Sequence, residues 1–280
     1  MKKIRRVDPS VYSEHYYLND CLGSDEFKKS HGTLFHPRVE QLLQKIKIKK
    51  GMNVLDVGCG RGDIVFFCAG KGAHAVGIDY SRDGIRLAEN VYKKQKKDIQ
   101  RRSSFYVMDA KKLTFPDNTF DAVISVDVFE HLYPEELEIA LSEISRVLKP
   151  QGKLLVHTEA NKLYLNYTHR FYTYPVSTLL LFFNSFISSV QYGGLPRDPR
   201  NDLHKLQHVN EPTYFYLRSL FMRHRFQGHI YQIIGMLKPI LSWKDRIYNC
   251  IVLLSPLSYF PPLIYFFAYE YLCVMKNKKQ

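Results

Sequence analysis

The stretch VLDVGCGRGDI, residues 54–64, constrains the fold most strongly. It begins as an apolar run typical of a buried strand and continues with Gly58, Gly60 and Gly62, separated by single residues. Glycines directly after a strand allow the main chain to approach a ligand closely. We therefore expect a ligand site at the end of this strand.

Strand-like runs and helical patterns alternate around this loop. A helical pattern covers 39–46, and the clearest helix covers 134–148, where apolar residues form one stripe before Pro150 and Gly152. The further strand-like runs are 74–78, 104–108, 122–126 and 152–157. This alternation predicts an α/β fold in which helices cover both faces of a parallel sheet and ligands bind at the carboxyl ends of the strands.

The second half of the chain reads differently. Residues 161–200 are rich in Tyr, Phe, Leu and Pro, and 171–196 contain no charge, which favours an insertion with a buried or interfacial helix. A helix start follows at 210–212, and strands are expected near 228–234 and 269–275.

The uncharged run 247–269 is long enough to span a bilayer, but it contains Pro256, Pro261 and Pro262. Prolines break a helix unless neighbours satisfy its backbone. We expect two short helices here, docked on the domain or at a membrane surface.

The composition of the chain bears on its partners and its location. The chain has 280 residues and a formal net charge of +13, which favours anionic partners, although a solvated basic surface explains it equally well. The basic run 93–102 is interpreted as a solvated face. Five scattered cysteines and a basic, polar N-terminus predict a reducing, cytoplasmic location, with peripheral contact to the inner membrane surface as an extension.

Acidic residues limit which ligand the glycine loop can bind. A dinucleotide fingerprint requires glycine at 63, where this chain has Asp63, and Asp56 would repel a pyrophosphate but attract a cation. Asp79 follows Gly58 by 21 residues, the spacing of an acid that holds ribose hydroxyls. Asp109 ends the third strand, where a carboxylate can accept from an adenine amino group. Together these placements describe S-adenosylmethionine.

The motifs VLDVGCGRGDI, GIDYS, VMDAKKLTFPDNTFD, VDVFEHL and VLKPQGKLLV resemble, in order and spacing, those of class I S-adenosylmethionine-dependent methyltransferases. The resemblance covers about residues 40–160. It implies a Rossmann-like, seven-stranded, mostly parallel sheet with an antiparallel final strand and apolar helical insertions in the C-terminal half. The residues it assigns to S-adenosylmethionine are Asp56, Gly58, Cys59, Gly60, Gly62, Asp79, Tyr80, Asp109, Ala110, Asp127 and Val128.

Methyl transfer from a sulfonium needs mainly alignment and exclusion of water, and a base only where the acceptor loses a proton. The candidate bases are His131, His157 and His208, with Glu130 and Glu159 beside them. Asp127, Glu130 and His131 also resemble a metal-binding cluster of ubiquinone-biosynthesis O-methyltransferases. The same sequence pattern is widespread among metal-free relatives, so no metal is expected.

Four segments are expected. They are an N-terminal lid or arm at 1–37, the donor-binding core at 38–160, an acceptor-side insertion at 161–209, and a completion of the sheet at 210–280 that contains the membrane-interfacial run 247–268.

The segments HTEAN and HVNEPTYFYLRSLF are similar to those of bacterial methyltransferases encoded with cell-surface glycan and lipid-linked biosynthesis. The predicted enzyme methylates an oxygen of a small-molecule, glycan, lipid-linked or quinone-like acceptor. An RNA methyltransferase and a non-catalytic donor-binding regulatory module are the alternatives. No N-P-P-Y-type tetrad follows the fourth strand, which counts against nucleic acid.

Overall fold

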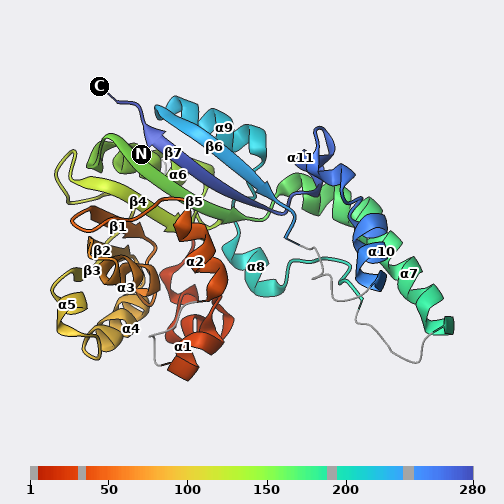
Figure 1. The fold of residues 1–280 in the computed structure, drawn as a ribbon, viewed down its shortest axis with the longest axis horizontal. Helices are drawn as coiled ribbons and strands as arrows, with labels where there is room; N and C mark the ends of the chain where they lie inside the picture. The colour runs from red at the N-terminus through yellow and green to blue at the C-terminus, as the bar shows by residue number, and fades with distance from the viewer. Residues whose placement is uncertain (1–5, 31–35, 188–193, 236–242, 280) are drawn as a thin grey trace.

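The computed structural model describes residues 6–30, 36–187, 194–235 and 243–279. The expected N-terminal arm, the acceptor-side insertion and the C-terminal segment each include a few residues outside these ranges. One seven-stranded sheet organises the chain, in the order β3-β2-β1-β4-β5-β7-β6 (Figure 1). Its strands are β1 (Asn53–Val57), β2 (His74–Asp79), β3 (Ser103–Val107), β4 (Phe120–Val126), β5 (Leu148–Glu159), β6 (Phe226–Ile233) and β7 (Glu270–Asn277).

Strand direction brings the predicted acids to one edge of the sheet. β1 to β5 pair in parallel, and only β7 runs antiparallel to its neighbours β5 and β6. The carboxyl ends of β1, β2 and β4 therefore lie together, next to the glycine loop. This arrangement confirms the predicted mostly parallel sheet, including both late strands.

Helices cover both faces of the sheet, as expected, because successive strand residues point to opposite sides. On one face, Leu55 and Leu154 pack with α6 (Pro134–Val147) and α9 (Tyr214–Arg223). On the other face, Val54 and Leu155 pack with α2 (Pro37–Gln44), α3 (Asp63–Gly70) and α4 (Arg82–Tyr92). The short helix α5 (Lys97–Gln100) precedes β3.

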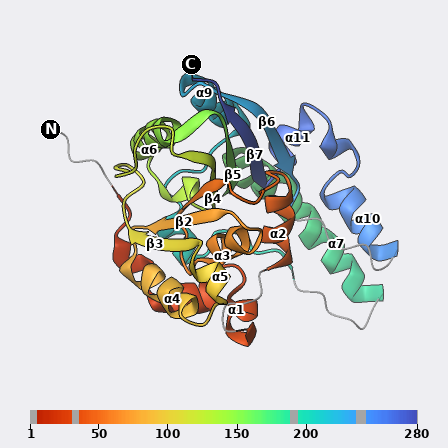
Figure 2. The ribbon, with the colours of Figure 1, turned by 60° about the vertical axis from the view of Figure 1, so that its left-hand side comes forward.

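A helical arm extends beyond the sheet, on the right in Figure 1 and again separate from the sheet in Figure 2. It consists of η4 (Tyr164–Thr173), α7 (Tyr174–Ile187), α10 (Trp243–Val252), η5 (Leu257–Tyr259) and α11 (Leu263–Phe267). Val252, Leu253, Ile264 and Phe267 form its own small core. The run 247–269 is thus broken into short helices, as its prolines predicted. Among the described residues, none of the helices combines the length and apolar character that a membrane crossing requires.

The N-terminal segment packs against the glycine loop. It contains η1 (Pro9–Val11), η2 (Tyr16–Asp20) and α1 (Ser24–Ser30). Its buried residues Tyr12 and Tyr17 pack with Leu87 of α4. This segment lies across the carboxyl end of β1 and β2.

Candidate functional site

A cavity of about 610 Å³ opens at the carboxyl ends of the strands. Its wall combines the glycine loop, the N-terminal tyrosines, the segment after β4 and the region of α8 (Asp202–Gln207). The predicted site residues that line it are Asp56, Gly58, Cys59, Gly60, Asp79, Tyr80, Asp109, Ala110, Asp127, Val128, His131 and His208. Gly62 and His157 are not part of the lining.

Glycine is required at two positions of the loop. Gly58 has φ +76°, and a Cβ there would lie 2.3 Å from Val128 Cγ2. Gly60 has φ +47°, and a Cβ there would lie 2.9 Å from the ring of Tyr17. Side chains at these positions would strain the backbone and clash with Val128 and Tyr17. The loop therefore requires glycine at both positions, and the close approach of a ligand to it stays a prediction.

Asp56, at the end of β1, is the most unusual group in the cavity. It is 2% exposed, and within the described chain neither carboxylate oxygen has a hydrogen-bond partner. Burial, and then the nearby Asp79 and Asp63, raise the pKa of Asp56 well above its usual value. A buried acid without partners is costly. A cationic ligand group in the cavity would offset that cost, so the site fits the ammonium of S-adenosylmethionine.

Asp79, at the end of β2, is also buried but is well supplied with donors. Its Oδ2 accepts from the Gly60 N–H at 2.9 Å and from Tyr17 Oη at 3.3 Å, while Oδ1 accepts from the Ser81 N–H at 2.8 Å. Burial raises the pKa of Asp79 despite these hydrogen bonds. A ribose at this carboxylate would share it with Tyr17 or replace the tyrosine hydroxyl.

Asp109 follows β3 and has two local contacts. Its Oδ1 accepts from the Lys111 N–H at 2.9 Å, and its Oδ2 pairs with Lys111 Nζ at 2.9 Å. Lys111 Nζ also lies 2.8 Å from Glu136. The carboxylate thus closes a turn at the cavity wall, where an adenine contact remains our proposal.

Asp127, at the cavity wall, pairs with the buried His157 behind it. Asp127 Oδ1 bonds His157 Nδ1, and His157 Nε2 lies 3.3 Å from both Glu270 Oε2 and an Arg38 Nη. Burial alone would lower the pKa of His157, but Asp127 and Glu270 raise it to about 10. Burial alone would likewise raise the pKa of Asp127, yet His157 keeps it below its usual value. Both ring nitrogens of His157 have partners, and His157 is not among the residues that line the cavity, so its role as a base stays a prediction.

His131 and His208 both reach the cavity wall. Burial lowers the pKa of His131 to about 4, and burial with the neighbouring His131 and His204 lowers that of His208 to about 3. Burial, with Asp127 and Glu270, raises the pKa of Glu159 to about 7. The cavity therefore holds imidazoles that are neutral near neutral pH and can accept a hydrogen bond or bind a cation.

Several wall residues were missed at the level of sequence. Tyr12, Tyr16 and Tyr17 line the cavity from the N-terminal segment, and His204 joins from α8. The spacing of His204 and His208, one helical turn apart, was a usable signal, and their rings stack at 4.7 Å.

Arg61, inside the glycine loop, was also missed. It is 3% exposed and donates to the Tyr17 carbonyl at 2.6 Å and to the Leu22 carbonyl at 2.8 Å. Its guanidinium also lies 4.6 Å from the centre of the Phe27 ring. Arg61 therefore fixes the N-terminal segment over the cavity.

Comparison with known proteins assigns the domain. Residues 55–156 match the family model described as "Methyltransferase domain". A sterol 24-C-methyltransferase from Aspergillus fumigatus is 34% identical over 167 residues, which cover 53% of this chain and 42% of that protein. A probable tRNA methyltransferase 9B from Homo sapiens is 34% identical over 125 residues, covering 44% of this chain and 24% of that protein. The chain thus spans less than half the length of these curated relatives.

The fold as a whole has solved counterparts. The PH0226 protein from Pyrococcus horikoshii is 24% identical, with a TM-score of 0.52, and the match covers 94% of this chain and 95% of that one. Residues 55–156 therefore form a methyltransferase domain, for which S-adenosylmethionine is the methyl donor. The chain as a whole shares the seven-stranded, Rossmann-like fold of such solved structures. The name of one relative mentions a sterol and the name of the other mentions tRNA. The match to this domain therefore does not identify the methyl acceptor.

Proposed function

We propose that this protein transfers the methyl group of S-adenosylmethionine to an oxygen of an amphiphilic small molecule, such as a glycan, lipid-linked or quinone-like acceptor, at a membrane surface. The observation that carries the donor assignment is Asp56, a buried carboxylate without a partner in the described chain and facing the cavity. The acceptor assignment rests on the helical arm.

The donor-site residues divide the ligand between them. Asp56 holds the ammonium, the glycine-loop N–H groups hold the carboxylate, Asp79 holds the ribose, and Asp109 with Ala110 holds the adenine. When bound, S-adenosylmethionine supplies an electrophilic methyl group on sulfur. The acceptor oxygen would bond to that carbon, the electron pair of the broken C–S bond would go to sulfur, and the hydroxyl proton would pass to a base or a single water molecule at the cavity wall. The tyrosines of the N-terminal segment exclude bulk water during the transfer.

The helical arm supports an amphiphilic acceptor. We call the following residues the arm surface: Phe171, Phe182, Trp243, Leu257 and Phe260, each more than half exposed. So many exposed large apolar side chains on one arm are unusual for a protein that contacts only water. Lipid contact through shallow insertion explains them without a spanning helix. The same insertion contributes α8, which lines the cavity, and so links lipid contact to the acceptor side.

One labelling experiment tests this proposal against both alternatives. Purified protein is incubated with S-adenosylmethionine labelled in its methyl group, together with membrane lipid extract, total RNA or buffer. We expect label in the lipid fraction that neither base nor heat releases. Loosely bound donor would be released by such treatment. Label in RNA would favour the RNA methyltransferase, and donor binding without transfer to any fraction would favour a regulatory module.

A further inference from the structure

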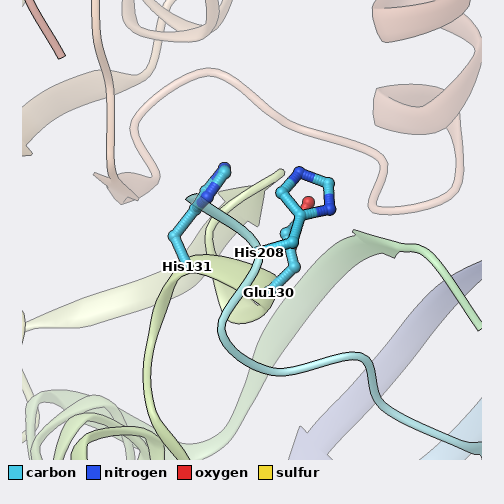
Figure 3. Close-up of side chains that lie close together, drawn as sticks. All are labelled: Glu130, His131 and His208. Atoms are coloured by element: carbon cyan, nitrogen blue, oxygen red, sulfur yellow. The ribbon is translucent and has the colours of Figure 1, made fainter. Parts of the chain in front are cut away.

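Three potential metal ligands meet at the cavity wall. Ligand atoms of Glu130, His131 and His208 all lie within 4.8 Å of one another. Glu130 and His131 belong to η3 (Phe129–His131) after β4, whereas His208 follows α8, more than seventy residues later. Figure 3 shows the three side chains lying close together on these two segments.

Outer hydrogen bonds orient two of these side chains. His131 Nδ1 lies 3.2 Å from the Gln207 carbonyl oxygen, which can only accept, so Nδ1 carries the proton and Nε2 keeps its lone pair. Glu130 Oε2 accepts from Thr158 Oγ1 at 2.7 Å, which leaves Oε1 as the ligand atom of this carboxylate. Metal-binding histidines and carboxylates are held in this way by outer partners that fix the ligand atom.

The remaining oxygen of Glu130 points independently to a ligand. Glu130 is 0% exposed, and its Oε1 has no hydrogen-bond partner in the described chain. An unsatisfied oxygen of a fully buried carboxyl is destabilising unless something in the cavity contacts it. The two neighbouring imidazoles are ligands for the same kind of partner, a cation.

We propose that Glu130, His131 and His208 bind a divalent transition-metal ion of the Zn²⁺ type. Two imidazole nitrogens and one carboxylate oxygen are the ligand set of sites that leave a coordination position open. With bonds of about 2.0–2.2 Å, ligand atoms in a tetrahedral site lie about 3.3–3.6 Å apart. The ligand atoms, now within 4.8 Å of one another, would have to move closer together when the ion binds.

This inference departs from the expectation of no metal and from the cluster that the sequence suggested. Asp127 lies outside the group of close ligand atoms, and its Oδ1 bonds His157. The decisive ligand is His208, which the sequence did not connect with η3. A second group, Glu159, His204 and His208, shares that histidine, but no outer hydrogen bond is recorded for its carboxylate within the described residues.

The site would also act in the proposed reaction, and this role rests on the proposed function. A cation at the cavity wall lowers the pKa of a hydroxyl placed beside it, as zinc does for water. An acceptor hydroxyl could then lose its proton near neutral pH. Metal binding itself requires no methyl transfer and can be measured separately.

Calorimetric titration of the metal-stripped full chain with Zn²⁺, and absorption on titration with Co²⁺, tests the site. We expect one ion per wild-type chain. His131→Ala and His208→Ala should weaken Zn²⁺ affinity by more than about 100-fold, and Thr158→Val by about 10-fold through the lost outer hydrogen bond. His204→Ala and the exposed His229→Ala should stay within about threefold of wild type.

Two outcomes would overturn the assignment. Wild type binding Zn²⁺ no more tightly than His208→Ala would remove the site, and loss in His204→Ala with retention in His131→Ala would move it to the other group. S-adenosylmethionine titrated into the same metal-free samples reports on the donor site and on folding of each variant. A failure of the metal site is thereby separated from a failure of the proposed function.

Discussion

At the scale of single residues, the site is defined by which buried charges have partners. Asp127 and His157 satisfy one another, whereas Asp56 and one oxygen of Glu130 have no hydrogen-bond partner in the described chain. Paired charges stabilise the fold. Unpaired buried charges destabilise it unless a bound ligand offsets their cost. The two kinds of charge should respond oppositely to substitution.

Asp56→Asn keeps the shape of the side chain and removes its charge. We expect S-adenosylmethionine affinity to fall by about 10- to 100-fold, because a charge-assisted hydrogen bond to the ammonium is lost. The ligand-free variant should melt roughly 2 °C or more above wild type, because the unpartnered buried acid is gone. Calorimetry and thermal unfolding measure the two effects.

Asp121→Asn is the matched control. Asp121 pairs with Lys149 at 2.6 Å and accepts from the Asn53 N–H at 2.8 Å, away from the cavity lining. This variant should lose stability and keep its donor affinity. If Asp56→Asn behaved in the same way, Asp56 would be a structural residue.

His157→Gln tests the paired charges through pH. The pKa of His157 is raised from 6.5 to about 10, so its protonated form stabilises the fold fully below pH 6.5 and loses that effect as pH rises toward 10. The gap in unfolding free energy between wild type and His157→Gln should therefore be larger at pH 6 than at pH 10. Urea unfolding at both values measures it, and a gap that does not change with pH would contradict the charged pair.

At the scale of elements, the glycine loop and the N-terminal segment work as one unit. Arg61 donates to carbonyl oxygens of Tyr17 and Leu22, and Tyr17 in turn packs on Gly60 and donates to Asp79. Buried charge-assisted hydrogen bonds of this kind contribute more than exposed ion pairs. The segment is thus held over the donor site by the loop that binds the donor.

Arg61→Gln should loosen the N-terminal segment. We expect chymotrypsin to cleave within residues 7–30 about tenfold faster than in wild type, followed by mass spectrometry of the fragments. Arg86→Gln is the control, since Arg86 also contacts this segment, through Glu14 at 2.6 Å, but is 56% exposed. Equal cleavage of both variants would mean that Arg61 does not anchor the segment.

The sequence predicted elements well where local rules decide them. Periodicity and backbone preference predict the strand β1, the glycine loop with Asp56 and Asp79, and the proline-broken run 247–269. The approach of His208 to His131, and the contact of Arg61 with Tyr17, depend on how distant segments pack. Such contacts leave no periodic signal, although the spacing of His204 and His208 was visible.

At the scale of the whole molecule, the sheet, the N-terminal segment and the insertion together line one cavity, and the residues of the arm surface are exposed. The arm that carries them extends to one side of the sheet (Figure 1). The formal charge of +13 adds attraction to acidic lipids. Apolar and electrostatic contributions predict different responses to substitution and to salt.

Trp243→Ser combined with Phe260→Ser should weaken sedimentation with phosphatidylcholine vesicles that contain phosphatidylglycerol. We expect at least about tenfold weaker binding, because each large side chain contributes about 1.5–3 kcal/mol when it leaves water. Met222→Ser, which alters a residue 66% exposed on α9 outside the arm surface, should bind like wild type. Complete release of wild type by high salt would point to electrostatic attachment alone.

The central claim is that the glycine loop and Asp56 hold S-adenosylmethionine. The most direct test is a calorimetric titration of the purified protein with S-adenosylmethionine and, separately, with the nicotinamide dinucleotides. Our account predicts micromolar binding of S-adenosylmethionine and no measurable binding of the dinucleotides. Binding of a dinucleotide alone would contradict the account, beginning with the role of Asp56.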